Sequence, residues 1–139
     1  MAEGGDVEFT IVLAEDDPNL RTLYANWLRR DGHCVLEAAD GAEALVLVRS
    51  KQPQLLLLDI WMPVLNGLEV LEHLGGSADA MGVKVVVLSH QNDADTRLEG
   101  FAMGVCDYWT KDLSLAELSS RVAALLGVVL PKAPAASDG

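Results

Sequence analysis

The chain has 139 residues, which suits one domain, and half of them are hydrophobic, so it can bury a real core. Its net charge of −11 repels phosphate backbones and anionic lipids, which argues against direct binding of nucleic acid or of a membrane surface. The apolar runs are far shorter than the roughly 20 residues of a membrane span, residues 1–6 have no secretion-signal character, and two unpaired-looking cysteines favour a reduced, cytoplasmic setting.

Unbroken apolar segments predict three strands, at residues 9–14, 55–58 and 85–88. None of them alternates apolar with polar residues, and such continuous apolar strands are typical of a parallel sheet that is covered on both faces. Two weaker strands are predicted at residues 34–38 and 107–110.

Helical periodicity fills the segments between the strands. The first helix is predicted from one apolar face at helical spacing, made of Leu20, Leu23, Tyr24, Trp27 and Leu28. Asp17 followed by Pro18 is typical of a helix start, and Gly32 ends the helix.

Three capping-box patterns predict further helix starts near residues 41, 67 and 115, and a polar residue at 92 or 93 opens another helix after residue 89. Residues 75–82 are predicted to be a loose loop.

The resulting order is strand then helix, five times. This order predicts an α/β fold with a single doubly wound, five-stranded parallel sheet flanked by five helices. We expect a flexible N-terminus at 1–6, one domain over 7–127, and a flexible tail or linker at 128–139 that leads to an output domain if the chain continues.

Polar side chains directly follow four of the predicted strands. They are Glu15, Asp16 and Asp17 after the first strand, Asp59 after the third, Ser89 after the fourth and Lys111 after the fifth. Because ligands of open α/β sheets bind beyond the carboxyl ends of the strands, we expect these groups to meet in one crevice. Asp17 is interpreted separately, as the helix cap.

The chemistry of this set points to phosphoryl transfer. Clustered carboxylates repel one another unless a cation joins them, and an oxygen-only ligand set suits Mg²⁺, with Mn²⁺ as the alternative. A divalent ion and an ammonium group together offset the repulsion between a carboxylate and a phosphoryl donor. The sequence therefore predicts an aspartyl phosphate on Asp59.

At this point the sequence resembles the receiver domains of two-component response regulators, chemotaxis-type receivers among them. The matching stretches are IVLAEDDPNLR at 11–21, LLLLDIWMPVLNG at 55–67, VVVLS at 85–89 and DYWTK at 107–111. The resemblance spans about residues 8–127, and it implies a flavodoxin-like strand order of 2-1-3-4-5.

The resemblance also implies roles at the metal site. Asp59 would be the phosphoacceptor and a metal ligand, Asp16 a direct ligand, and Glu15 a ligand acting mainly through water. The backbone carbonyl of Trp61 would complete the protein ligands.

The remaining roles concern the loaded state. Ser89 would bond the phosphoryl oxygens, and Lys111 would pair with Asp59 before phosphorylation and with the phosphoryl group afterwards. Tyr108 occupies the position of the family's switch aromatic. The donor would be a histidine kinase or a histidine phosphotransfer protein, and the output face would comprise the helix after Ser89, the fifth strand and the last helix, where a homodimer is also plausible.

Some positions depart from the family pattern. Asp112 follows Lys111 where the family usually has a proline preceded by a cis bond, so the loop is either trans or strained. His90, Trp61 and Gln91 are large residues near the mouth of the site, and we interpret them as modulators of access. His90 would narrow the access of phosphoryl donors or bond the phosphoryl group, and Trp61 and Gln91 would crowd the path of hydrolytic water.

Three other functions are conceivable for this fold. A pseudo-receiver that binds partners without phosphorylation would explain Asp112 and His90. A Mg²⁺ phosphohydrolase would need a second acid two residues after Asp59, where Trp61 stands. A flavin module is disfavoured because the acidic loop after the first strand repels a cofactor phosphate. We therefore expect a signalling domain that catalyses its own phosphorylation and dephosphorylation and no metabolic turnover.

Overall fold

The computed structural model describes residues 9–75, 77–90 and 104–127. The strands are β1 (Thr10–Ala14), β2 (Cys34–Ala38), β3 (Leu55–Asp59), β4 (Lys84–Ser89) and β5 (Asp107–Thr110). The helices are α1 (Pro18–Arg30), α2 (Gly41–Lys51), α3 (Gly67–Leu74), α4 (Ser77–Met81) and α6 (Leu115–Leu126). The strands form one parallel sheet in the order β2-β1-β3-β4-β5, which confirms the predicted flavodoxin-like topology.

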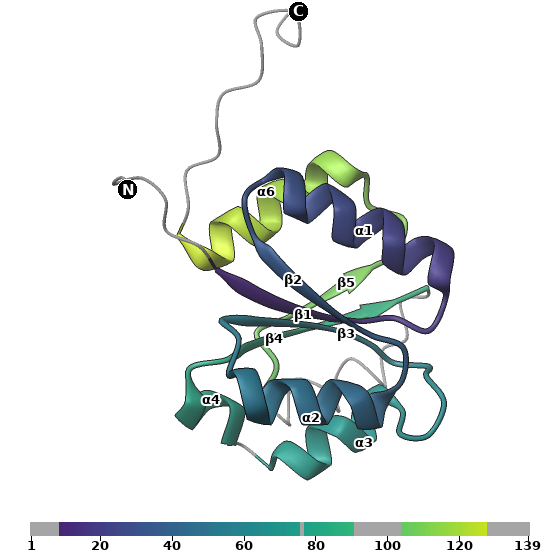
Figure 1. The fold of residues 1–139 in the computed structure, drawn as a ribbon, viewed down its shortest axis with the longest axis vertical. Helices are drawn as coiled ribbons and strands as arrows, with labels where there is room; N and C mark the ends of the chain where they lie inside the picture. Colours follow the sequence, from purple (N-terminus) through teal and green to yellow (C-terminus); the bar gives the residue numbers. More distant parts are fainter. Residues whose placement is uncertain (1–8, 76, 91–103, 128–139) are drawn as a thin grey trace, which may run out of the picture.

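The sheet lies between two layers of helices (Figure 1). Helices α1 and α6 cover one face, and α2, α3 and α4 cover the other. On β1, Ile11 and Leu13 pack with the first layer, whereas Val12 and Ala14 pack with the second. Because successive strand residues point to opposite faces, both sets must be apolar, and this explains the unbroken apolar strands of the sequence.

Helix α1 starts as the sequence predicts. The carboxylate of Asp17 accepts hydrogen bonds from the backbone N–H groups of Asn19 and Leu20, at 2.9 and 3.3 Å, and Pro18 occupies the first turn. After the helix, Gly32 has a φ of +95°, a left-handed conformation that glycine adopts without a steric penalty.

The buried face of α1 is narrower than the predicted apolar stripe. Tyr24, Ala25 and Leu28 are buried, but Leu23 is 48% exposed. Trp27 is partly exposed, and the guanidinium of Arg30 lies 4.3 Å from the centre of its ring. The interpretation of Leu23 and Trp27 as core residues is therefore only partly right, because the sheet contacts a limited arc of the helix.

The other helix starts also follow the sequence. Both reciprocal capping boxes predicted before α3 and α6 are present. Before α2, Asp40 accepts the N–H of Glu43 at 2.8 Å, but the carboxylate of Glu43 accepts the N–H of Ala39 instead of closing the box.

One loop prediction is wrong. Residues 75–82, expected to be a loose loop, contain the short helix α4, whose Ala78 is buried beside Val83 and Leu74. Burial of an apolar side chain stabilises a turn of helix that the sequence pattern alone does not indicate.

Other expectations fall on residues outside the described part. The helix expected after residue 92 or 93 and the flexible ends at 1–6 and 128–139 lie there. Among the helices that the structure describes, none combines the length and the apolar character required to cross a bilayer.

Candidate functional site

The predicted site residues converge at the carboxyl edge of the sheet. Glu15 and Asp16 follow β1, Asp59 ends β3, and Lys111 follows β5. Strands β1 and β3 are neighbours in register, with Ala14 opposite Leu58, so the residues that follow them meet. The parallel sheet thereby brings together groups from different strands that lie 43 to 96 positions apart in the chain.

A buried ion-pair network links three of these side chains. The Lys111 Nζ atom lies 2.6 Å from Glu15 Oε1 and 3.1 Å from Asp59 Oδ1. Glu15 is 1% exposed and Asp59 is 2% exposed. Two carboxyl groups thus share one ammonium group, which leaves an excess of negative charge in a region of low dielectric constant when both are ionised.

This charge imbalance shifts the pKa of Asp59. Burial and the neighbouring charge of Glu15 raise its pKa to about 7, and this rise persists although Lys111 and the backbone N–H of Trp61 act in the opposite direction. Burial by itself lowers the pKa of Lys111, but its contacts with Glu15 and Asp59 outweigh burial and raise it. Lys111 is therefore a cation at neutral pH.

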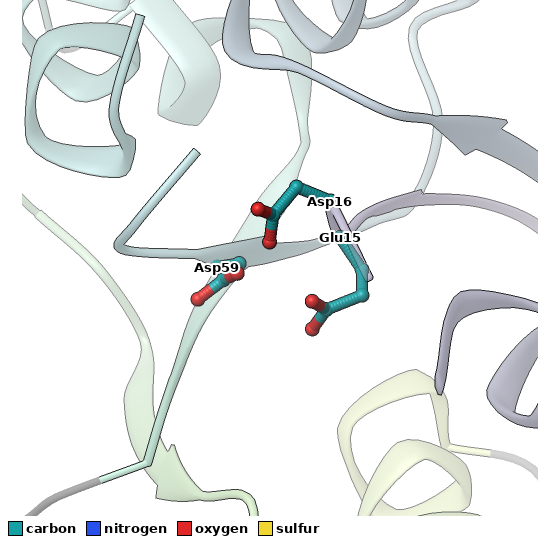
Figure 2. Close-up of side chains that lie close together, drawn as sticks. All are labelled: Glu15, Asp16 and Asp59. Carbon is teal, nitrogen blue, oxygen red and sulfur yellow. The ribbon is translucent and has the colours of Figure 1, made fainter. Parts of the chain in front are cut away.

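The third acid faces the same space from the solvent side. Glu15, Asp16 and Asp59 each offer an oxygen, and these oxygens lie within 4.8 Å of one another. Figure 2 shows the carboxyl group of Asp16 directed toward that of Asp59. Asp16 is exposed, so the cluster opens to solvent on one side. An all-oxygen set with surplus negative charge fits a hard divalent cation such as Mg²⁺.

Backbone contacts hold the two acid-bearing loops in place. Glu15 Oε2 accepts the N–H of Asp17 at 3.1 Å, and Asp59 Oδ1 accepts the N–H of Trp61 at 3.3 Å. The second contact brings the backbone of Trp61 beside the carboxylate; the resemblance to the receiver family implies a carbonyl ligand at this residue.

Gly67 allows the loop after β3 to close on the site. Its N–H donates to the carbonyl of Ile60 at 2.7 Å. A Cβ atom at position 67 would lie 2.6 Å from the carbonyl oxygen of Asp59 and 2.9 Å from the Cα of Ile60. Only a residue without a side chain fits so close to the backbone of Asp59.

The remaining predicted switch residues lie on the strands β4 and β5. Ser89 is buried at the end of β4, and its carbonyl accepts the N–H of Lys111 at 2.7 Å. Tyr108 on β5 is buried in the core layer formed with α2 and α3. The bond between Lys111 and Asp112 is trans, so of the two conformations expected for this loop the structure has the trans form.

The predicted access modulators are exposed where the structure describes them. Trp61 is 65% exposed and His90 is also exposed. Gln91 lies outside the described residues. Val64, a neighbour of Trp61 in the same loop, is exposed as well.

The sequence assigned no role to Arg21 or to its partner Glu37, which contact the site. Arg21 Nη1 donates to the backbone carbonyl of Glu15 at 2.7 Å, and Arg21 Nε lies 3.4 Å from Glu37 Oε1. Arg21 belongs to the stretch that resembles the receiver family, but an arginine on a helix is most often a solvated residue. Only the tertiary structure places it beside the acid pair.

Comparisons with known proteins agree with this fold. The profile described as the response regulator receiver domain matches residues 11–123. The chain is 36% identical to the response regulator MprA of Mycobacterium tuberculosis over 127 residues. The aligned region covers 91% of this chain and 54% of MprA. Over 117 residues it is 32% identical to the probable transcriptional regulatory protein TcrX of Mycobacterium tuberculosis, covering 84% of this chain and 49% of TcrX. The chain therefore spans about half the length of these curated relatives.

Solved structures show the same similarity. The receiver domain of the Francisella response regulator 1452 superposes with a TM-score of 0.76 at 28% identity, covering 86% of this chain and 97% of that one. A putative response regulator from Chloroflexus aurantiacus gives a TM-score of 0.77 at 26% identity, covering 87% and 99%. From the profile match over residues 11–123 and the similarity to MprA, the chain belongs to the response regulator receiver domain family, a family of two-component signalling modules and not of metabolic enzymes.

Proposed function

We propose that this domain accepts a phosphoryl group on a carboxylate oxygen of Asp59, from a phosphohistidine of a histidine kinase or a histidine phosphotransfer protein. The P–N bond to the imidazole breaks, the imidazole keeps the electron pair, and an O–P bond to Asp59 forms. The observation that carries the proposal is the buried network in which Lys111 lies 3.1 Å from Asp59 and 2.6 Å from Glu15. The domain acts on its own side chain and is a signalling module.

A divalent cation has a clear place in this proposal. Asp16, Asp59 and the backbone carbonyl of Trp61 would hold Mg²⁺ or Mn²⁺, with Glu15 acting mainly through water. When bound, the ion supplies positive charge that offsets the repulsion between the carboxylate and the incoming phosphoryl oxygens. The support is the acid cluster, whose oxygens lie within 4.8 Å of one another.

The chain's own residues provide the rest of the chemistry. Lys111 is buried and cationic beside Asp59. Its ammonium group can therefore exchange the Asp59 carboxylate for the phosphoryl oxygens as a hydrogen-bond partner while it stays buried. Ser89 ends the neighbouring strand and would donate its hydroxyl to the same oxygens. Tyr108 would respond to the movement of Ser89.

Phosphorylation would then bias two conformations of the output face. Ser89 and Lys111 gain phosphoryl contacts only in the loaded state, and a difference in contacts is what shifts a two-state equilibrium. The face comprises β5, α6 and the helix expected after Ser89. A homodimer through this face, or an output domain attached after residue 130, would receive the signal.

The test is phosphate uptake from a small donor. The protein should gain one phosphoryl group from acetyl phosphate or phosphoramidate in the presence of Mg²⁺, measured by intact mass. Asp59→Asn should abolish the gain, and EDTA should suppress it. Asp17→Asn is the matched control, because Asp17 is an exposed helix cap and Asn caps a helix equally well.

The alternative is a pseudo-receiver that binds its partner without phosphorylation. It is favoured if Mg²⁺ and both donors leave the mass of the protein unchanged while the folded protein still binds a partner. The replacement of the family's proline by Asp112 is weak support for this alternative. The bond between Lys111 and Asp112 is trans, and Lys111 still lies 3.1 Å from Asp59.

A further inference from the structure

Arg21 connects the acid pair to the edge strand of the sheet. It lies in the second turn of α1, and its side chain is 18% exposed. One end of the guanidinium donates to the carbonyl of Glu15 at 2.7 Å, while its Nε lies 3.4 Å from Glu37 on β2. Glu37 is held in turn by Arg29, at 3.1 Å. The chain of contacts therefore runs from Arg29 through Glu37 and Arg21 to the backbone of Glu15.

Residues of strand β2 fix the backbone of Glu15 at both its N–H and its carbonyl group. The N–H of Glu15 donates to the carbonyl of Ala38 at 3.0 Å. The carbonyl of Glu15 is held by Arg21, whose position depends on Glu37, the residue before Ala38. This carbonyl belongs to the peptide unit that joins Glu15 to Asp16, so its orientation sets the direction in which Asp16 leaves the strand.

We propose that Arg21 is a positioning residue for the cation site: by holding the Glu15 carbonyl, it keeps the carboxylate of Asp16 directed toward Asp59. The proposal rests on the proposed function, in which this cluster binds Mg²⁺. In the described part of the chain, Arg21 contacts the carbonyl of Glu15 and the carboxylate of Glu37, and it touches none of the proposed ligand oxygens. It acts on the peptide plane between the two acids, as outer contacts that orient metal ligands do.

Charge and geometry predict opposite effects of removing Arg21. A guanidinium near the cluster repels a divalent cation, so its loss would strengthen binding if charge dominated. However, Glu37 pairs with Arg21 at 3.4 Å, so the carboxylate of Glu37 already offsets much of this positive charge. The loss of the 2.7 Å hydrogen bond to Glu15 is not offset by Glu37. We therefore expect the loss of the hydrogen bond to outweigh the loss of charge repulsion, and Mg²⁺ binding to weaken.

The experiment measures Mg²⁺ affinity by calorimetry on the full chain, and urea unfolding in EDTA reports the structural effect separately. Arg21→Met keeps the length and apolar stem of the side chain and should weaken Mg²⁺ binding about 10-fold, the lower end of the range for orienting contacts. Arg21→Lys keeps the charge but cannot reach both acceptors with a planar fork, so it should weaken binding as well. If Arg21→Met does not fold, the Mg²⁺ affinity of Arg21→Lys is the measurement that decides.

Arg29→Met is the matched control. It removes an equal charge from the same Glu37, together with a bond to the carbonyl of Val35, but leaves the Arg21–Glu15 bond intact. It should lower the urea midpoint and change the Mg²⁺ affinity by less than about twofold, as expected for a screened, exposed charge.

The outcomes separate this inference from the proposed function. Absence of Mg²⁺ binding by the unmodified protein would overturn both. If the unmodified protein binds Mg²⁺, three results would overturn the positioning role alone: unchanged or tighter binding by Arg21→Met, unmodified affinity in Arg21→Lys, or an equal loss in Arg29→Met. Weaker binding confined to the two Arg21 variants supports it.

Discussion

Replacing Asp59 by asparagine should stabilise the metal-free protein. Asp59 is 2% exposed, and its pKa is raised from 3.8 to about 7. A rise of about three units corresponds to roughly 4 kcal/mol spent on ionising this carboxyl group in the folded state. Asparagine avoids that cost, and the figure already includes the opposing contacts with Lys111. We therefore expect a gain of up to about 4 kcal/mol at pH 8.

The pH dependence follows from the direction of the shift. Because the pKa of Asp59 is higher in the folded state, the folded protein binds this proton more tightly than the unfolded chain does. The resulting stabilisation is complete below pH 3.8 and is lost as the pH rises to about 7. The advantage of Asp59→Asn over the unmodified protein should therefore shrink by roughly 2.5–3 kcal/mol between pH 8 and pH 5.

Urea unfolding in EDTA at these two pH values measures the difference. Asp17→Asn, which changes an exposed carboxylate two residues from Glu15, should stay within about 0.5 kcal/mol of the unmodified protein. Mg²⁺ at about 100 times its dissociation constant should add about 2.7 kcal/mol to the unmodified protein and much less to Asp59→Asn. If Asp59→Asn is no more stable than the unmodified protein at pH 8 in EDTA, the account of the buried charges is wrong.

Three further changes test other parts of the structure. Gly67→Ala should lower the free energy of unfolding in urea by about 1–3 kcal/mol, because the new Cβ meets the backbone of Asp59. Gly127→Ala has a φ of +70° but open space around it, so it should lower the free energy of unfolding by only about 1 kcal/mol. Equal losses in the two variants would contradict the steric argument. Burial lowers the pKa of His33, so the unmodified protein should lose stability relative to His33→Gln as the pH falls below 6.5, and an unchanged difference between pH 7.5 and 5.5 would refute this. Trp61→Ala should hydrolyse the phosphorylated form faster, since it removes bulk from the mouth of the site; an unchanged dephosphorylation rate would show that Trp61 does not limit access.

Much of the fold could be predicted because its signals are local. Unbroken apolar strands report burial on both faces, and an acceptor followed by Glu three residues later reports a helix start, whatever the rest of the chain does. Helix α4 was missed because its stability comes from the burial of Ala78 against the core, which is a tertiary contact. The same reason explains why Leu23 on α1 is exposed although it belongs to the apolar stripe.

The sequence by itself determined the site's membership: the residues that follow each strand must meet at one edge once the sheet is parallel. Asp59, Asp16, Glu15 and Lys111 were all identified in this way. Only the tertiary structure decided how they share their charges, with Lys111 between two buried carboxyl groups, and which outside residue holds them. Arg21 could not be identified from the sequence, because its partner is a backbone carbonyl that leaves no signature in side-chain chemistry, and the contact exists only where α1 packs beside β2.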